Sequence, residues 1–250
     1  MQGSVSLPLP NPPEKKDIFD MNHGAIFMAA AGSLLVTGAA TAGAFQSLSM
    51  DLVNVGDQGT TYRLFAHLAT GARINSVYGD SQGDLFIGTA NGATIYQNAN
   101  GGPTSKEINS NFFPFVPSME WDSYVSIGAY YQNGAPFGEN NLNYTGINWS
   151  SFEGGGDLVT NNGSWFVAPE DAQGNELNGV VFLGQFTIQG GYGDTSDLIG
   201  QVNLQGTDSN GDAWNEIGAT WMESTDPAVP GIGALAPLAC IGLVRRRRRG

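Results

Sequence analysis

Residues 80–96 read DSQGDLFIGTANGATIY. The segment opens with turn-forming residues at 80–84, and the apolar run 85–89 that follows has the length of a β-strand. The dipeptide Asn91-Gly92 favours a two-residue turn, so it predicts a hairpin between 85–89 and a second strand at 93–96. The repeating unit of the fold is therefore predicted to be a short strand bounded by turn residues.

The same alternation recurs along the body of the chain. Strand-like runs lie at residues 61–68, 74–78, 121–131, 157–160, 164–167, 180–189, 198–205 and 214–222. Turns rich in Asn, Asp and Gly at 161–163 and 208–212 predict two further hairpins. About ten short strands with little helical periodicity predict an all-β fold, an antiparallel β-sandwich of jelly-roll-like form.

The composition makes this body strongly acidic. Residues 45–226 hold 20 Asp and Glu against two arginines and one lysine, a net charge of −17, whereas the 250-residue chain carries −13. Such a charge repels nucleic acid and anionic lipid, so we expect no nucleic-acid partner. The single cysteine, Cys240, lies near the C-terminus, which excludes an intramolecular disulfide and a thiol nucleophile in the body.

The N-terminal part of the chain has the features of an export signal. Residues 21–44 begin with Met21 and pass through an apolar stretch to small residues, as a secretory signal peptide does. Ala42 and Ala44 form an A-x-A cleavage pattern, with Ala40-Thr41-Ala42 as a competing frame, so signal peptidase is an expected partner. The Pro-rich leader 1–20 either extends the signal or lies upstream of a true start at Met21.

The C-terminal part combines a proline-marked joint, an apolar run and an arginine block. Val229, Pro230 and Gly231 open it. Residues 232–244 carry no charge, and five cations follow: Arg245, Arg246, Arg247, Arg248 and Arg249. The apolar residues partition into hydrocarbon and the arginines stay on the cytoplasmic side, so this order predicts a membrane stop. Because the run is shorter than the roughly 20 residues that span a bilayer, we expect a temporary anchor.

This order of parts resembles the PEP-CTERM class of bacterial sorting tails over residues 227–250. The motif departs from the commonest form, because residues 229–233 read VPGIG and lack its Glu and second Pro. The resemblance implies that a sortase-type membrane enzyme removes the tail of an envelope or biofilm protein. The alternative is a C-terminal helix buried in the fold, which would place five arginines beside a core.

These features divide the chain into four parts. We expect a leader at 1–20, a signal peptide at 21–44, a β-sandwich domain at 45–224, and a linker with the sorting segment at 225–250, with a hydrophobic helix at each end. Around 112–115 and 118–123 the middle domain is also similar to uncharacterised bodies of exported bacterial surface proteins. That second resemblance implies no particular activity.

Two patterns in the body could carry catalysis. His67 is the only histidine after the signal, so a Ser-His-Asp triad would need it, but no G-x-S-x-G pattern accompanies it. Glu120 and Asp122 flank Trp121 and could form the acid pair of a glycoside hydrolase, although residues two apart on a strand lie closer than such pairs do. We therefore predict no enzyme, with His67 a structural or surface histidine and the acid pair on a solvated strand face.

Two other patterns could carry binding. Asp208, Asn210 and Asp212 place oxygens at alternating positions, as calcium loops do, whereas the alternative is an ordinary hairpin turn without a metal. Four aromatic residues in or near predicted loops would suit a glycan-binding face, or else fill the core: Tyr130, Tyr131, Trp149 and Trp165.

Together these observations predict an exported protein of the cell envelope, cell surface or extracellular matrix, held transiently in the membrane by its C-terminus. The expected role is structural or adhesive, without catalysis. The alternative is a lectin-like carbohydrate-binding domain that Ca²⁺ assists and that takes an extracellular polysaccharide as its partner.

Overall fold

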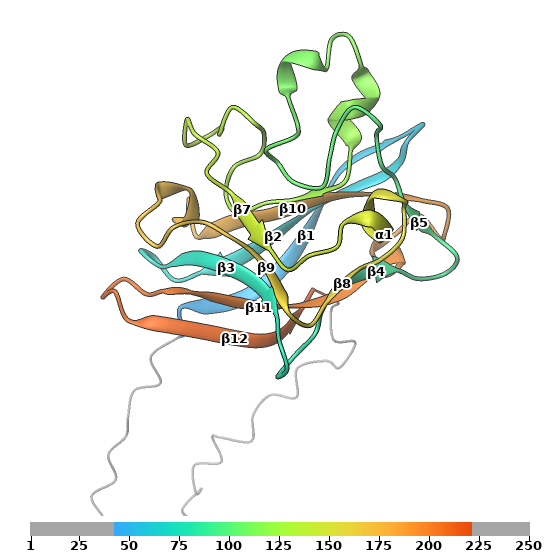
Figure 1. Cartoon of the computed structure of the whole chain (residues 1–250). Coiled ribbons are helices and arrows are strands. Elements are labelled where there is room, and N and C mark those ends of the chain that lie inside the picture. Colours follow the sequence, from blue (N-terminus) through green and yellow to red (C-terminus); the bar gives the residue numbers. More distant parts are fainter. Residues whose placement is uncertain (1–42, 222–250) are drawn as a thin grey trace, which may run out of the picture. The chain divides into compact units, whose positions relative to one another are not determined.

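A computed structural model of the chain describes residues 43–221 (Figure 1). The two predicted terminal helices lie outside these residues, as do the cleavage residue Ala42 and all of the predicted sorting residues. Ala44 lies inside them, and its carbonyl oxygen accepts a hydrogen bond from the Ala69 N–H at 2.8 Å. Between residues 43 and 221, no helix is both long and apolar enough to cross a membrane.

The described chain folds into two antiparallel sheets. Sheet A has the order β1-β2-β10-β5, with β6 also on β10, from the strands β1 (Phe45–Gly56), β2 (Gly59–Leu68), β10 (Val180–Gln189), β5 (Thr94–Ile95) and β6 (Tyr124–Val125). Sheet B has the order β7-β9-β3-β11-β4-β8, with β12 also on β11, from the strands β7 (Asn143–Thr145), β9 (Gly163–Phe166), β3 (Arg73–Gly79), β11 (Leu198–Thr207), β4 (Leu85–Thr89), β8 (Leu158–Thr160) and β12 (Ala213–Thr220). The predicted antiparallel all-β fold is confirmed.

Helical structure in residues 43–221 is confined to short turns. They are the four-residue α1 (Ser150–Glu153) and the 3-10 turns η1 (Ser110–Phe112), η2 (Pro117–Trp121), η3 (Ala172–Gly174) and η4 (Thr195–Asp197). Asn109, Asp171 and Asp194 each cap the start of one of the 3-10 turns by accepting a backbone N–H with the side chain.

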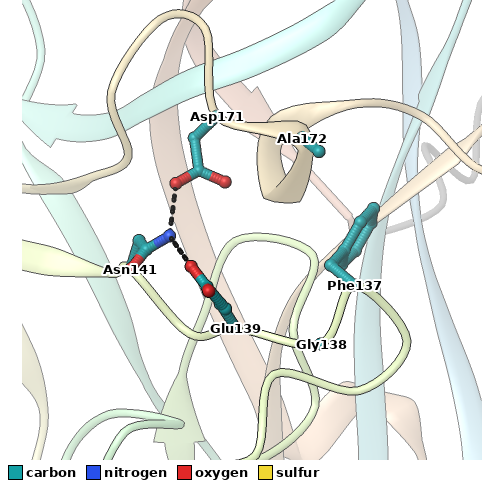
Figure 2. Close-up of a pocket in the computed structure, with 6 residues that line it drawn as sticks. All are labelled: Phe137, Gly138, Glu139, Asn141, Asp171 and Ala172. Atoms are coloured by element: carbon teal, nitrogen blue, oxygen red, sulfur yellow. Dashed lines mark hydrogen bonds between the residues drawn. The ribbon is translucent and has the colours of Figure 1, made fainter.

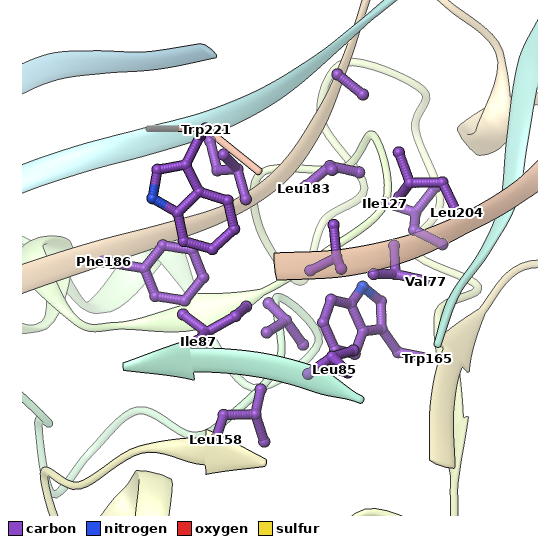
Figure 3. Close-up of a cluster of buried hydrophobic side chains, with 14 of the residues drawn as sticks. Val77, Leu85, Ile87, Ile127, Leu158, Trp165, Leu183, Phe186, Leu204 and Trp221 are labelled. Carbon is purple, nitrogen blue, oxygen red and sulfur yellow. The ribbon is translucent and has the colours of Figure 1, made fainter. Parts of the chain in front are cut away.

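Both sheets contribute to one apolar core, part of which Figure 3 shows. Sheet A places alternate residues of β2 there, and sheet B adds residues of β3, β4 and β11; members drawn in the figure include Val77, Leu85, Ile87, Leu183, Phe186 and Leu204. A register shift between Phe182 and Gly184 changes which side chains of β10 face this core. The core thus joins the two sheets into one body.

Strand β10 is buried along almost its whole length, with only its two end residues partly or fully exposed. An ordinary sandwich strand buries alternate residues, because one of its faces meets solvent. Here the face of sheet A that points away from the core is also covered, by parts of residues 97–142, a segment that we call the cap and that also contains β6. In Figure 1 the cap is the green segment above β10, β2 and β1.

Two hairpin predictions are wrong in their pairing. Asn91 and Gly92 do form a two-residue turn with φ of 56° and 74°, closed by the Ala93 N–H to the Ala90 oxygen at 2.9 Å. However, β4 belongs to sheet B and β5 to sheet A, so the turn carries the chain between sheets. Strands β8 and β9 likewise do not pair with each other, because β8 pairs with β4 and β9 with β3.

The hairpin predicted around 208–212 is confirmed, because β11 and β12 pair with Thr207 opposite Ala213. The long strand predicted at 121–131 is not, since the chain is a 3-10 turn up to Trp121 and pairs as a strand only at β6. The twelve-residue β1 was not predicted. Two register shifts interrupt it, which breaks the alternation by which a strand is found in a sequence.

Candidate functional site

The cap packs on sheet A through a small apolar layer. Ile108 and Tyr124 from the cap and Phe182 from β10 are buried together. Four partly buried aromatic residues pack against them: Phe65, Phe113, Tyr130 and Tyr131. The cap is therefore built onto the sheet, and the surfaces that its loops present are held in place from below.

Asp122 fixes the base of the cap. Its side chain is fully buried, and its carboxylate accepts backbone N–H groups from Asn98 at 2.7 Å, Ser123 at 2.9 Å and Gly102 at 3.2 Å. Burial raises the pKa of Asp122 to about 7, although these three hydrogen bonds act in the opposite direction. The carboxylate is thus used to organise the cap loops, and the predicted solvated acid pair Glu120 and Asp122 is wrong.

Arg63 of β2 lies beneath the loops of the cap. Its Nε donates to Gln185 Oε1 at 3.1 Å and its Nη2 to the Tyr131 hydroxyl at 3.3 Å. Its guanidinium carbon lies 5.0 Å from the centre of the Tyr130 ring, the geometry of a cation–π contact. The ring of Tyr130 also packs on Phe182, with 4.6 Å between the ring centres. These contacts fix the position of both tyrosines.

Beside Tyr130 the surface forms a hollow of about 240 Å³, which we call the aromatic groove. Its floor comes from β2 and β10 and its walls from residues 128–137 and 175–178. The apolar side chains that line it include Phe65, Tyr130, Pro136, Phe137, Leu177 and Val180, and the amides of Asn175 and Asn178 lie among them. The groove can take an apolar or aromatic group from outside the chain.

Phe112 and Phe115 form a projection that we call the phenylalanine knob. Their side chains are 52% and 80% exposed, in a chain whose other phenylalanines of residues 43–221 are at least partly buried. The backbone here is tightly turned, with N–H groups of Phe115 and Val116 donating to the Phe112 oxygen at 2.9 and 2.8 Å. Phe113 anchors the turn, because its ring meets Tyr131 edge-on at 5.3 Å. Two phenyl rings are therefore presented on a rigid support.

A third surface feature is an open hollow of about 510 Å³ that contains the acids Glu139 and Asp171 (Figure 2). Asn141 lies between them, and its Nδ2 donates to Asp171 Oδ2 at 2.8 Å and to Glu139 Oε2 at 3.5 Å. The other oxygen of Asp171 accepts the Gln173 N–H at 2.9 Å. Both carboxylates thus have protein partners, and the hollow is a hydrogen-bonded surface feature.

Within residues 43–221, His67 is not part of a Ser-His-Asp triad. It lies on β2, and its Nε2 is 2.8 Å from Ser49 Oγ of β1. No side-chain carboxylate of residues 43–221 is hydrogen-bonded to its other ring nitrogen, so nothing in this part of the chain orients the ring as a triad requires. The pair links two neighbouring strands.

The turn that carries Asp208, Asn210 and Asp212 is closed by its own hydrogen bonds. Asp208 Oδ1 accepts the N–H groups of Asp212 at 2.9 Å and Asn210 at 2.8 Å, which lower the pKa of Asp208. Over residues 43–221, no three His, Cys, Asp or Glu side chains gather as a metal site. Calcium at this turn stays a prediction.

The four aromatic candidates take different positions. Trp165 is buried in the core, and its indole N–H donates to the Ser126 oxygen at 3.0 Å, so it cannot face a glycan. Tyr130 and Tyr131 are partly buried in the cap. Trp149 packs against the core and meets the half-exposed Tyr144 edge-on at 5.2 Å.

Two candidate surfaces, the knob and the groove, were missed as sites from the sequence. The knob has a sequence signal, since three phenylalanines around one proline lie between polar turn residues at 109–111 and the turn at η2. The aromatic groove has none, because its lining comes from four separate segments. Comparisons of the chain with protein-family models, with curated proteins and with solved structures found no match.

Proposed function

We propose that the chain is an exported component of the cell envelope, cell surface or extracellular matrix with a structural or adhesive role. Export and sorting rest on the two ends of the sequence, with Ala42 and Ala44 at the signal cleavage site and Val229 to Gly231 at the start of the sorting tail. Signal peptidase and a sortase-type membrane enzyme are the processing partners. A jelly-roll-like form of the sandwich and a hydrophobic helix at each end stay predictions.

The observation that carries the adhesive role is the pair of rigid apolar surfaces on the cap, the phenylalanine knob and the aromatic groove. Exposed aromatic residues on a fixed backbone bind a partner with little loss of conformational freedom. The buried acids Asp122 and Asp197 accept backbone N–H groups, which is a structural use of groups that hydrolases employ for chemistry.

The domain also presents the cap away from its own ends. Strands β1 and β12 lie side by side, and residues of both line one hollow, so the described chain begins and ends in the same region. In Figure 1 that region lies at the opposite side of the body from the green cap. A tail that held the domain at a membrane would leave the cap free to meet a partner.

The experiment is mass spectrometry of the protein recovered from its own host, combined with fractionation of the cells. We expect the N-terminus near Phe45, a missing or modified C-terminus beyond Pro230, and recovery in the envelope or matrix fraction. A variant with Arg245 to Arg249 changed to serine should remain unprocessed. Recovery of the intact chain from the cytosol with its arginines in place would falsify the proposal.

The second candidate function is glycan binding. It is favoured by the aromatic groove, where Tyr130 and Phe137 lie beside the amides of Asn175 and Asn178, since sugars stack on aromatic rings and hydrogen-bond to amides. A glycan array with and without a chelator tests it. Glycan binding that wild type shows and Asn178→Ala loses supports this candidate. Loss of wild-type binding on addition of chelator supports a role for Ca²⁺ at Asp208, Asn210 and Asp212.

A further inference from the structure

The phenylalanine knob and the aromatic groove are complementary features of one chain. We propose that the knob of one copy inserts into the groove of a second copy, so that the protein associates with itself through its cap. This inference deepens the proposed structural role by naming the partner. It concerns the folded domain in solution, so it can succeed or fail independently of export.

The size of the groove suits the ring that the knob offers. Apolar cavities of about 150 Å³ are large enough to bind benzene, and the groove measures about 240 Å³. One phenyl ring, with room for part of the turn that carries it, therefore fits. Phe115 is the better candidate for insertion, because its side chain is 80% exposed, compared with 52% for Phe112.

The charge pattern of the chain also allows the two features to meet. Residues 108–119, which carry the knob, contain no charged residue, and the residues that line the groove are uncharged. Lys106, the one exposed Lys or Arg of residues 43–221, is followed directly by the exposed Glu107. In a body of net charge −17, the knob and the groove are thus surfaces at which two copies can meet with little charge repulsion.

A knob cannot occupy the groove of its own chain in this structure. Phe113 holds the turn against Tyr131, and both knob side chains point to solvent. Each copy has one knob and one groove, so two copies can exchange knobs across a two-fold axis, or each copy can pass its knob to the next in a head-to-tail contact. Repetition of that contact makes rings or filaments, which are assemblies that suit a matrix component.

The test is disulfide cross-linking between full-length copies that each carry one introduced cysteine. Cys240 is first replaced by serine, and Phe115→Cys and Leu177→Cys are then made in separate copies, one of them tagged. We expect mixed dimers between F115C and L177C on mild oxidation. The matched control pairs L177C with Y192C, because Tyr192 is 75% exposed but lies outside the cap. The yield of cross-linked dimer from this control pair should be lower by about fivefold or more.

A second measurement follows association of the otherwise unchanged chain by sedimentation. Phe115→Ser should weaken association about tenfold, whereas Tyr192→Ser should not change it. Equal cross-linking of the two cysteine pairs, or F115C dimers in place of mixed ones, overturns the proposal. A third outcome also overturns it: cross-linking gives no mixed dimers, and zwitterionic lipid vesicles bind wild type but not F115S. The knob would then be a membrane contact.

Discussion

Asp122 makes stability depend on pH in an unusual direction. Burial raises its pKa from 3.8 to about 7, so between these values the folded carboxyl keeps a proton that the unfolded chain has released. The free energy of unfolding should therefore fall as pH rises from about 4 to 7, and level off above 7, by an amount on the order of 4 kcal/mol at most. Urea denaturation across this range measures the effect.

The matched variants are Asp122→Asn and Glu120→Gln. An amide at position 122 cannot titrate, so the dependence on pH between 4 and 7 should be clearly flatter in Asp122→Asn. Glu120→Gln should keep the wild-type profile, because Glu120 lies on a partly exposed turn. Equal slopes in wild type and Asp122→Asn would show that other groups cause the pH dependence.

Asp197 makes stability depend on pH in the opposite direction. Burial alone would raise its pKa, but hydrogen bonds from the Tyr192 N–H at 3.0 Å, from Asn91 Nδ2 at 2.9 Å and from the Gly193 N–H outweigh it and hold the pKa below its ordinary value. Its contribution is therefore present above about pH 4 and is lost as pH falls further.

Asp197→Ala should lower the free energy of unfolding by about 1–3 kcal/mol at pH 7, because it removes the acceptor of these hydrogen bonds. Asp194→Ala, in the same loop, removes only the exposed cap of the turn η4 and should cost about 1 kcal/mol or less. Denaturation curves of the two variants give the comparison. If the two variants lost equal free energy of unfolding, the hydrogen bonds to the Asp197 carboxylate would contribute no more than the cap of η4.

At the scale of elements, the close approach of β3 to β11 requires glycine. A Cβ at Gly206 would overlap the carbonyl oxygen of Arg73 and lie 2.8 Å from the Trp214 ring, at a register shift between the two strands. Gly206→Ala should therefore cost about 2 kcal/mol or more. Gly56→Ala is the control, since its Cβ would meet only the Asn54 side chain, and its cost should stay within about 0.5 kcal/mol. Thermal unfolding of both variants measures the two losses of stability, and equal losses would contradict the requirement for glycine at position 206.

The strands predicted best from the sequence are those with strong local signals. β4 and β10 have the predicted bounds, because apolar runs end there at turn residues. Pairing was predicted less well. Asn91-Gly92 fixes a local reversal of the chain, but hydrogen bonds to distant residues decide which sheet receives each strand.

The candidate site was predicted least well, for a related reason. The sequence offered Asp122 as a surface acid, but its burial depends on the backbone of residues 98–102, which folds around it. The aromatic groove joins Phe65 to Leu177, more than a hundred residues apart. Exposure and proximity of this kind arise from tertiary packing, whereas a sequence pattern reports on neighbours along one strand or turn.

At the scale of the whole molecule, net charge opposes the association that the knob and groove favour. Residues 45–226 carry −17, so two copies repel each other over the Debye length, which is about 10 Å at 0.1 M salt and about 3 Å at 1 M. The knob–groove contact is apolar and loses little to salt. Self-association should therefore strengthen as salt rises from about 0.05 to 0.5 M, the reverse of an interface held by ion pairs.

Sedimentation of the full chain over this range of sodium chloride measures the effect. Phe115→Ser should associate weakly at every salt concentration, because removing repulsion does not restore the lost apolar contact. Lys106→Gln separates the two forces further. It removes the exposed cation of the cap segment, so its association should be weaker than wild type at low salt and approach wild type at high salt. If association of wild type instead fell with salt, attraction between charges would hold the copies together, and the apolar contact would not be the main one.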